Sequence, residues 1–223
     1  LSSSSAASDV YKRQGHPWAR FGIDLCIGSE ADQPITQRQM MFAPFYLMDA
    51  FDGAQIKGDS IQRPLITANE LIVDATPEPD ESDWMPTPLQ CSLLLFILTA
   101  AATIYGIRRR TGLWGIDLFL FGIAGIVGCV LAFLALFSQH PAVSSNFLLL
   151  VFHPGQLLFL PYIIYCVRKG KKCWYLTLNL AVLTLFIVLF PVIPQRFDFA
   201  VVPLALVLLI RSASNLIVTS KKK

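Results

Sequence analysis

Residues 113–137 read LWGIDLFLFGIAGIVGCVLAFLALF, an apolar stretch in which Asp117 is the single charged residue. A helix needs about 20 mostly apolar residues to cross the hydrocarbon core of a bilayer. Four more stretches of the chain meet this requirement: 89–107, 146–167, 173–193 and 199–219. The sequence therefore predicts an all-α membrane domain over 89–219, built as a bundle of five transmembrane helices.

The basic residues lie at one set of connections between these stretches. The turns at 108–112 and 168–172 and the tail at 220–223 hold ten Lys and Arg, and the opposite connections hold one, Arg196. Short loops rich in Lys and Arg stay in the cytoplasm. We therefore expect the basic tail to be cytoplasmic and the amino-terminal side to lie outside. The net charge of +3 is too small to indicate a nucleic-acid partner.

The first part of the chain has a different composition. Residues 1–14, LSSSSAASDVYKRQ, resemble translated sequencing adaptor, so we exclude them from the fold. Residues 15–75 read as the last part of an extracytoplasmic α+β domain, with a strand expected in 63–75. Residues 76–88, TPEPDESDWMPTP, read as an acidic, Pro-rich linker into the membrane. We expect a truncated α+β piece that precedes the bundle.

Familiar catalytic and metal signatures are missing from the sequence. It has no Gly-rich phosphate loop, no Ser/His/Asp pattern and no Cys/His spacing of a zinc site, so we predict neither a metal nor a cofactor. Cys26 is the one Cys outside the apolar stretches, and only His16 is near it in the sequence. We interpret Cys26 as an ordinary packed residue rather than a nucleophile.

Two charged residues lie within the predicted spans, where an unpaired charge is costly. Asp117 falls about a turn from the cytoplasmic end of the second span, and Arg211 about two turns from that end of the fifth. We predict that they form an intramembrane pair. The alternative is that Arg211 reaches the interface and Asp117 stays solvated.

Polar residues also gather at the start of the third span. Pro154 and Gly155 interrupt this span, and irregular backbone at membrane depth must be covered by protein or water. One hypothesis is an outward-facing polar cavity, which would take a lipid headgroup or a peptide end, lined by His140, Asn146, His153 and Gln156. The alternative is a kinked helix whose polar groups are purely structural.

Several short motifs resemble one known family. They are PWARFGIDLCIGS at 17–29 followed by Asp32, QMMFAP at 39–44, FGIAG at 121–125, and SQHP at 138–141 followed by Asn146. In this order they resemble the end of the periplasmic domain and the five-helix membrane domain of Lnb-type lipoprotein N-acyltransferases. The resemblance covers most of 17–170. It departs at His153, where that family would lead us to expect Asn.

The resemblance implies an enzyme of the bacterial inner membrane that acts on phospholipid and lipoprotein substrates. It would move an acyl chain from the phospholipid to a lipoprotein's terminal amino group through a Cys thioester. The Cys and His of that chemistry would lie upstream, so we expect no catalytic residue here and an inactive fragment. Two alternatives remain: a non-catalytic membrane anchor or scaffold, and a transporter component, which the few intramembrane charges disfavour.

Overall fold

A computed structural model describes residues 17–33, 36–41, 44–57, 62–70 and 85–220. The contacts divide the chain into two compact units, one of residues 1–15 and 33–84 and the other of 16–32 and 85–223. Residues 16–32, which we had grouped with 15–75, therefore belong with the membrane bundle. The predicted adaptor segment and the linker up to residue 84 lie outside the described residues.

The described part of the first unit is small. It contains two short helices and a hairpin: α3 (Gln37–Met40), α4 (Pro44–Asp52), β1 (Gln55–Lys57) and β2 (Gln62–Pro64). The strands pair antiparallel, with Ile56 opposite Arg63. Pro44 begins α4, as its fixed φ and missing N–H favour at a first helical position. The strand expected in 63–75 is represented by β2, and its predicted centre at 71–73 lies outside the described residues.

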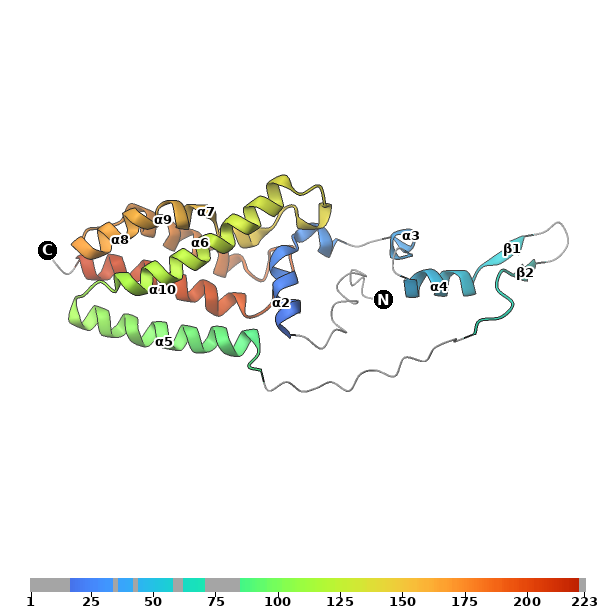
Figure 1. The fold of residues 1–223 in the computed structure, drawn as a ribbon, viewed down its shortest axis with the longest axis horizontal. Helices are drawn as coiled ribbons and strands as arrows, with labels where there is room; N and C mark the ends of the chain where they lie inside the picture. The colour runs from blue at the N-terminus through green and yellow to red at the C-terminus, as the bar shows by residue number, and fades with distance from the viewer. Residues whose placement is uncertain (1–16, 34–35, 42–43, 58–61, 71–84, 221–223) are drawn as a thin grey trace. The chain divides into compact units, whose positions relative to one another are not determined.

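The second unit is a helical bundle. Its main elements are α5 (Pro88–Arg109), α6 (Trp114–Phe137), α7 (Pro154–Leu158), α8 (Leu160–Lys169), α9 (Trp174–Leu189) and α10 (Val201–Ser220). Figure 1 shows these helices running back and forth between two ends, with α5, α8 and α10 all ending at the left. We call this the basic end, because it carries Arg108–Arg110 and Arg168–Lys172. The connections at 138–146 and 190–200 lie at the opposite end, which we call the loop end.

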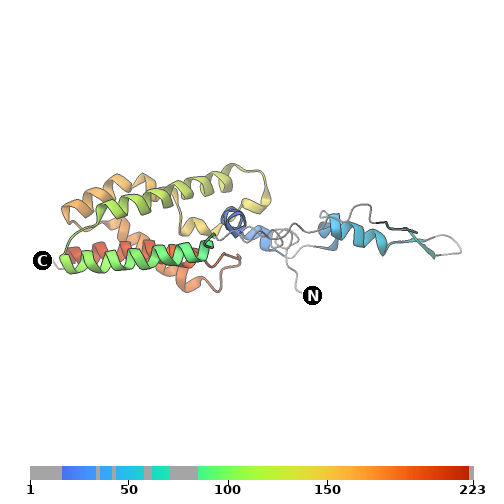
Figure 2. The same cartoon turned by 60° about the horizontal axis from the view of Figure 1, so that its bottom comes forward.

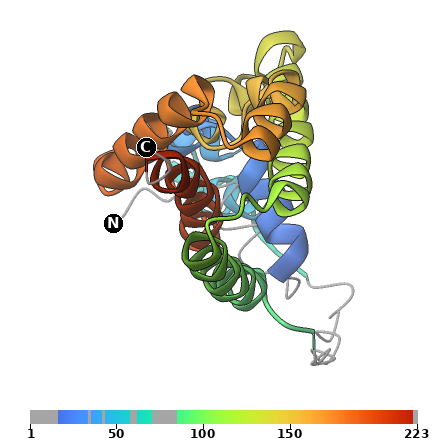
Figure 3. The same cartoon turned by 90° about the vertical axis from the view of Figure 1, so that its left-hand side faces the viewer.

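Two layers make up the bundle. In one layer α10 packs between α5 and α9, and in the other α6 packs against α7 and α8. Figure 2 shows the layers one above the other, and Figure 3 shows α10, in red, flanked by its neighbours. The core between the layers includes Phe121, Ile163 and Phe186, which are fully buried. Exposed Leu, Ile, Val and Phe residues cover the outside, as suits a lipid-facing surface.

Three helices, α5, α6 and α10, are long and apolar enough to cross a membrane. A fourth span exists if Phe147–Leu158 and Leu160–Lys169 are taken together, although they meet at a bend of 74°. The kink that we expected at Pro154 is present as a break before α7, and the bend of 74° falls at Phe159, two residues before Pro161. Proline removes a helical N–H and clashes with the preceding turn, which accounts for both interruptions.

The predicted span 173–193 is shorter in the structure. Helix α9 has 16 residues, which corresponds to about 24 Å at 1.5 Å per residue. It ends at Leu189, and residues 191–195 form turns that contain Pro191 and Pro194. This length is somewhat less than the roughly 30 Å of a hydrocarbon core.

Two glycines of α6 set the distance between the layer's helices. A Cβ on Gly125 would lie 2.5 Å from the backbone N of Leu157, and one on Gly128 would lie 2.5 Å from the backbone of His153. Only glycine permits so close an approach of two backbones. The broken third segment is therefore seated directly on α6.

Candidate functional site

A buried ion pair joins the two layers. Arg211 on α10 donates from Nε to Asp117 Oδ1 at 2.7 Å and from Nη2 to Oδ2 at 3.0 Å. Each side chain is 2% exposed. The remaining nitrogen, Nη1, donates to the hydroxyl of Thr103 on α5 at 3.0 Å. The structure thus brings Asp117 and Arg211 together and uses them to tie α5, α6 and α10.

The four residues predicted to line one polar cavity have different partners in the structure. His140 is exposed in the loop, where its Nδ1 accepts from the N–H of Ala142 at 3.3 Å. Asn146 is buried at the loop end. His153 lies deeper, 3.4 Å from Asn179 Oδ1, and Asn179 in turn donates to Ser212 on α10 at 3.0 Å.

Gln156, the fourth of these residues, is fully buried and donates to the carbonyl of Val151 at 2.7 Å. Its Oε1 and the hydroxyl of Tyr175 are the buried side-chain atoms, within the described part of the chain, that lack a partner. Asn146 caps the short 3₁₀ turn η3 (Phe147–Leu150), where its Oδ1 accepts from the N–H of Leu148 at 2.9 Å.

An amide clamp, made of Asn146 and Gln195, holds the segment before the first span onto the bundle. Asn146 Nδ2 donates to the carbonyl of Leu25 at 2.8 Å, and Gln195 Nε2 donates to that of Ile27 at 2.9 Å. The two amides bond to each other at 3.1 Å, and Gln195 Oε1 accepts from the N–H of Phe147 at 2.8 Å. Both side chains are buried and their hydrogen-bonding groups are occupied.

The clamped segment contains helix α2 (Pro17–Cys26) and the turn η1 (Ser29–Asp32). Helix α2 packs against α5 and α6, and Trp18 Nε1 donates to the carbonyl of Pro86 at 2.9 Å. Figure 1 shows α2 crossing the loop end of the bundle. Gly28 fits beside the loop because a Cβ there would collide with the carbonyl of Ser144. The motif at 17–29 therefore forms a docking segment.

We expect Gln195→Leu to loosen this docking segment. The substitution leaves the carbonyl of Ile27 and the N–H of Phe147 without a partner, at about 1–3 kcal/mol per buried group, and removes one of the two hydrogen bonds that Asn146 Oδ1 accepts. Hydrogen exchange of a peptide covering residues 25–32 should accelerate at least fivefold. Gln139→Leu, at an exposed position in the other loop, is the matched control and should leave exchange unchanged. Equal exchange in both variants would contradict the clamp.

An apolar pocket of about 170 Å³ lies beneath α2. Its walls come from α2, α5, α6, Phe152 and α10, and all its lining side chains are hydrocarbon or aromatic. Phe21 and Leu25 of α2 form part of the lining, and Ala124 and Val127 lie on the α6 wall. The docking segment therefore covers a cavity suited to an apolar chain.

Cys26 lies at the end of α2 and is half-buried. Burial raises the pKa of its thiol above the ordinary value, which lowers the thiolate fraction at neutral pH. A reactive Cys needs the opposite shift, so this environment fits a packed residue. In the part of the chain that the structure describes, no group of three or more His, Cys, Asp or Glu could hold a metal ion.

The sequence analysis did not single out three residues that complete these sites: Thr103, Asn179 and Gln195. Asn179 is an amide within an apolar span, and this alone could have marked it, because such groups need a partner in a membrane. Thr103 gives a weaker signal, since Thr is common in such helices. Gln195 lies in a polar loop between Pro194 and Arg196, where nothing in the pattern distinguishes it.

Comparison with known proteins gives one match. The family model described as the Lnb transmembrane domain, whose label denotes five transmembrane helices, matches residues 80–223. No curated protein and no solved structure matches the chain. The matched region contains the buried pair and both residues of the amide clamp, while α2 precedes it. Since the match covers more than half of the chain, this protein belongs to the Lnb family and contains its transmembrane domain.

Proposed function

We propose that this chain is the membrane portion of a bacterial inner-membrane enzyme that N-acylates lipoproteins with an acyl chain taken from a phospholipid. Membership of the Lnb family supports the proposal, as does the resemblance of residues 17–29 to the end of that family's periplasmic domain. The count of ten basic residues against one supports the orientation, with the basic end in the cytoplasm and the amide clamp at the periplasmic end.

The proposed chemistry has two steps. A thiolate attacks the ester carbonyl of the phospholipid, the acyl group becomes a thioester, and the lysophospholipid leaves with a proton delivered by a histidine. The lipoprotein's amino group then attacks the thioester, which forms the amide and returns the thiol. By the resemblance, the Cys and His lie upstream of residue 17. The task left to this chain is to hold the acyl chain near that thiol.

The observation that carries the proposal is the docking of α2 over the apolar pocket. The pocket opens between elements of the bundle, and a hydrocarbon chain gains about 0.8 kcal/mol for each CH₂ that it buries away from water. Helix α2 follows the upstream region in the chain and is fixed to the bundle through Asn146 and Gln195. An acyl chain held in the pocket would lie beside the segment that connects to the catalytic region.

We expect Val127→Trp to lower acyl transfer several-fold in the protein from the complete gene. Val127 lines the pocket, and the larger ring would fill the space that the chain needs. Val130→Trp is the matched control, since Val130 lies one turn further along α6 and is 51% exposed. The assay follows a labelled acyl chain from phospholipid to a lipopeptide with a free amino-terminal Cys. No transfer by the unmodified protein would overturn the proposed function.

A non-catalytic anchor is the second candidate. It is favoured by the hydrogen bonds that Asn146, His153 and Gln156 make within the fold. An anchor would tolerate the pocket change, so equal transfer by the Val127→Trp and Val130→Trp variants would favour it for this part of the protein. His153→Ala should also leave transfer unchanged if the bundle is only an anchor.

A further inference from the structure

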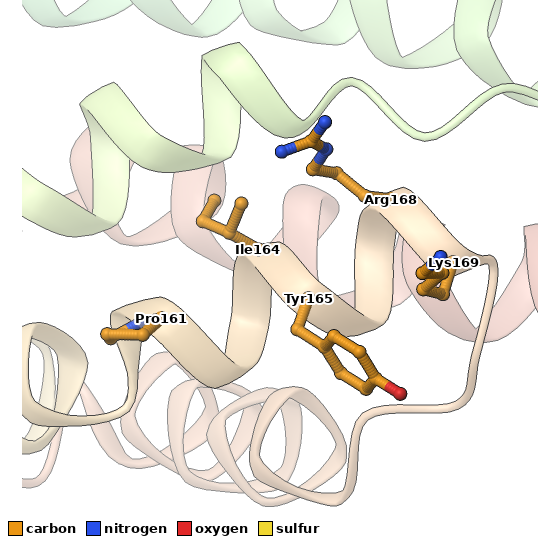
Figure 4. Close-up of a pocket in the computed structure, with 5 residues that line it drawn as sticks. All are labelled: Pro161, Ile164, Tyr165, Arg168 and Lys169. Carbon is orange, nitrogen blue, oxygen red and sulfur yellow. The ribbon is translucent and has the colours of Figure 1, made fainter.

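The outer face of α8 forms a second cavity, of different character from the pocket under α2. It has a volume of about 550 Å³ and is lined by Pro161, Ile164, Tyr165, Arg168 and Lys169. Figure 4 shows these side chains along one length of the helix, with Pro161 at one end and Lys169 at the other. The opposite face of α8, with Ile163, Cys166 and Val167, is buried against the bundle. One end of the cavity is thus apolar and the other cationic.

The cations of this cavity are not neutralised by carboxylates. Among the described residues the ion pairs are Arg20 with Asp24 and Arg211 with Asp117, and neither involves α8. Of the two lining cations, Arg168 contacts an aromatic ring, with its guanidinium 5.2 Å from the ring of Trp114; the next cation along the chain, Lys171, lies outside the lining. Lys171 Nζ donates to the hydroxyl of Tyr165 at 3.2 Å. Such contacts position a charge and leave it available to an anion.

We propose that the outer face of α8 binds an anionic phospholipid, with the headgroup phosphate at Arg168 and Lys169 and an acyl chain along Pro161 and Ile164. Basic pockets beside membrane helices recognise lipid headgroups in this way, and Arg offers a phosphate two parallel N–H donors. The apolar end of the cavity distinguishes a lipid from free phosphate. The site shares no lining residue with the pocket under α2, so the proposal does not depend on acyl transfer.

Trp114 provides a built-in reporter, because its ring lies beside Arg168. The full chain is reconstituted in phosphatidylcholine vesicles in which either brominated phosphatidylglycerol or brominated phosphatidylcholine replaces part of the lipid. The quenching of Trp114 fluorescence is taken as the difference in quenching between the unmodified chain and the Trp114→Phe variant. We expect half-maximal quenching at a mole fraction of brominated phosphatidylglycerol about 25-fold lower than that of brominated phosphatidylcholine, since each of the two cations contributes about fivefold.

The double variant Arg168→Gln/Lys169→Gln should remove this preference. Its matched control is Arg108→Gln/Arg109→Gln, which changes the same charge at the same end of the bundle on exposed positions of α5. An equal loss of the preference for anionic lipid in both double variants would mean that the overall positive charge of the basic end attracts the lipid. This result would overturn the proposed site. No preference in the unmodified chain would also overturn it, whether or not the variants fold. Relief of quenching by millimolar inorganic phosphate would identify a phosphate site rather than a lipid site.

Discussion

Asp117→Asn is expected to lower the free energy of unfolding of the membrane unit by about 3–5 kcal/mol, because Arg211 would keep a buried charge without its carboxylate. Arg211→Gln should cost a similar amount, since it leaves the Asp117 carboxylate buried among apolar side chains. The double variant should cost little more than either single one, because it buries no charge. Unfolding with rising SDS in mixed micelles measures all three.

The exposed pair Arg20 and Asp24 serves as the control for this cycle. Their closest atoms are 3.7 Å apart on the open face of α2, so Arg20→Gln and Asp24→Asn should each change stability by less than about 1 kcal/mol. Losses at Asp117 and Arg211 that simply add up in the double variant would mean that the two charges act independently. The contact in the structure would then carry no coupling energy.

Gly128→Ala is expected to destabilise the bundle by about 1–3 kcal/mol. The added methyl would meet the N, Cα and carbonyl carbon of His153, each 2.5 Å from its position. These are backbone atoms, so the third segment as a whole must shift from α6 and disturb the contact between His153 and Asn179. The same SDS titration reports the loss of stability.

Gly122→Ala is the matched control for this substitution. Its added methyl would meet only Leu160 Cδ2, at an ordinary 3.7 Å, and alanine is the better helix former by about 1 kcal/mol. We expect it to be neutral or slightly stabilising. Equal losses at Gly122 and Gly128 would mean that helix flexibility, rather than the approach of His153, explains the glycines.

Hydrophobic length predicted the long helices well. The stretch 113–137 corresponds to α6 at Trp114–Phe137, and 89–107 to α5 at Pro88–Arg109. The start of α5 is fixed by local chemistry, since Thr87 and Gln90 form a reciprocal capping box around Pro88. Such signals lie within a few residues of each other and can be read from one sequence.

The remaining features depend on contacts between distant residues. Pro161 accounts for an interruption near Phe159, but a proline alone does not predict the bend of 74°, nor the close approach of the third segment to Gly125 and Gly128. The pairing of Asp117 with Arg211 could be predicted because the two residues lie at similar depths in their predicted spans. The hydrogen bond from Arg211 to Thr103 could not be predicted in this way. The four polar residues at 140–156 are close in sequence, but their partners, which include Leu25 and Asn179, come from distant parts of the chain and could not be predicted.

The clamp also constrains the order in which the protein assembles. The carbonyl of Leu25 meets its partner 121 residues later in the chain, and that of Ile27 meets Gln195 168 residues later. Domains generally fold from the amino end as the chain is synthesised, but α2 cannot dock before its partners Asn146 and Gln195 have been made. It must wait, with its apolar face uncovered, until the connection before the last span has emerged. The docking of α2 is therefore completed only by the connection between α9 and α10, so a formed clamp reports that the chain has been made and folded as far as Gln195.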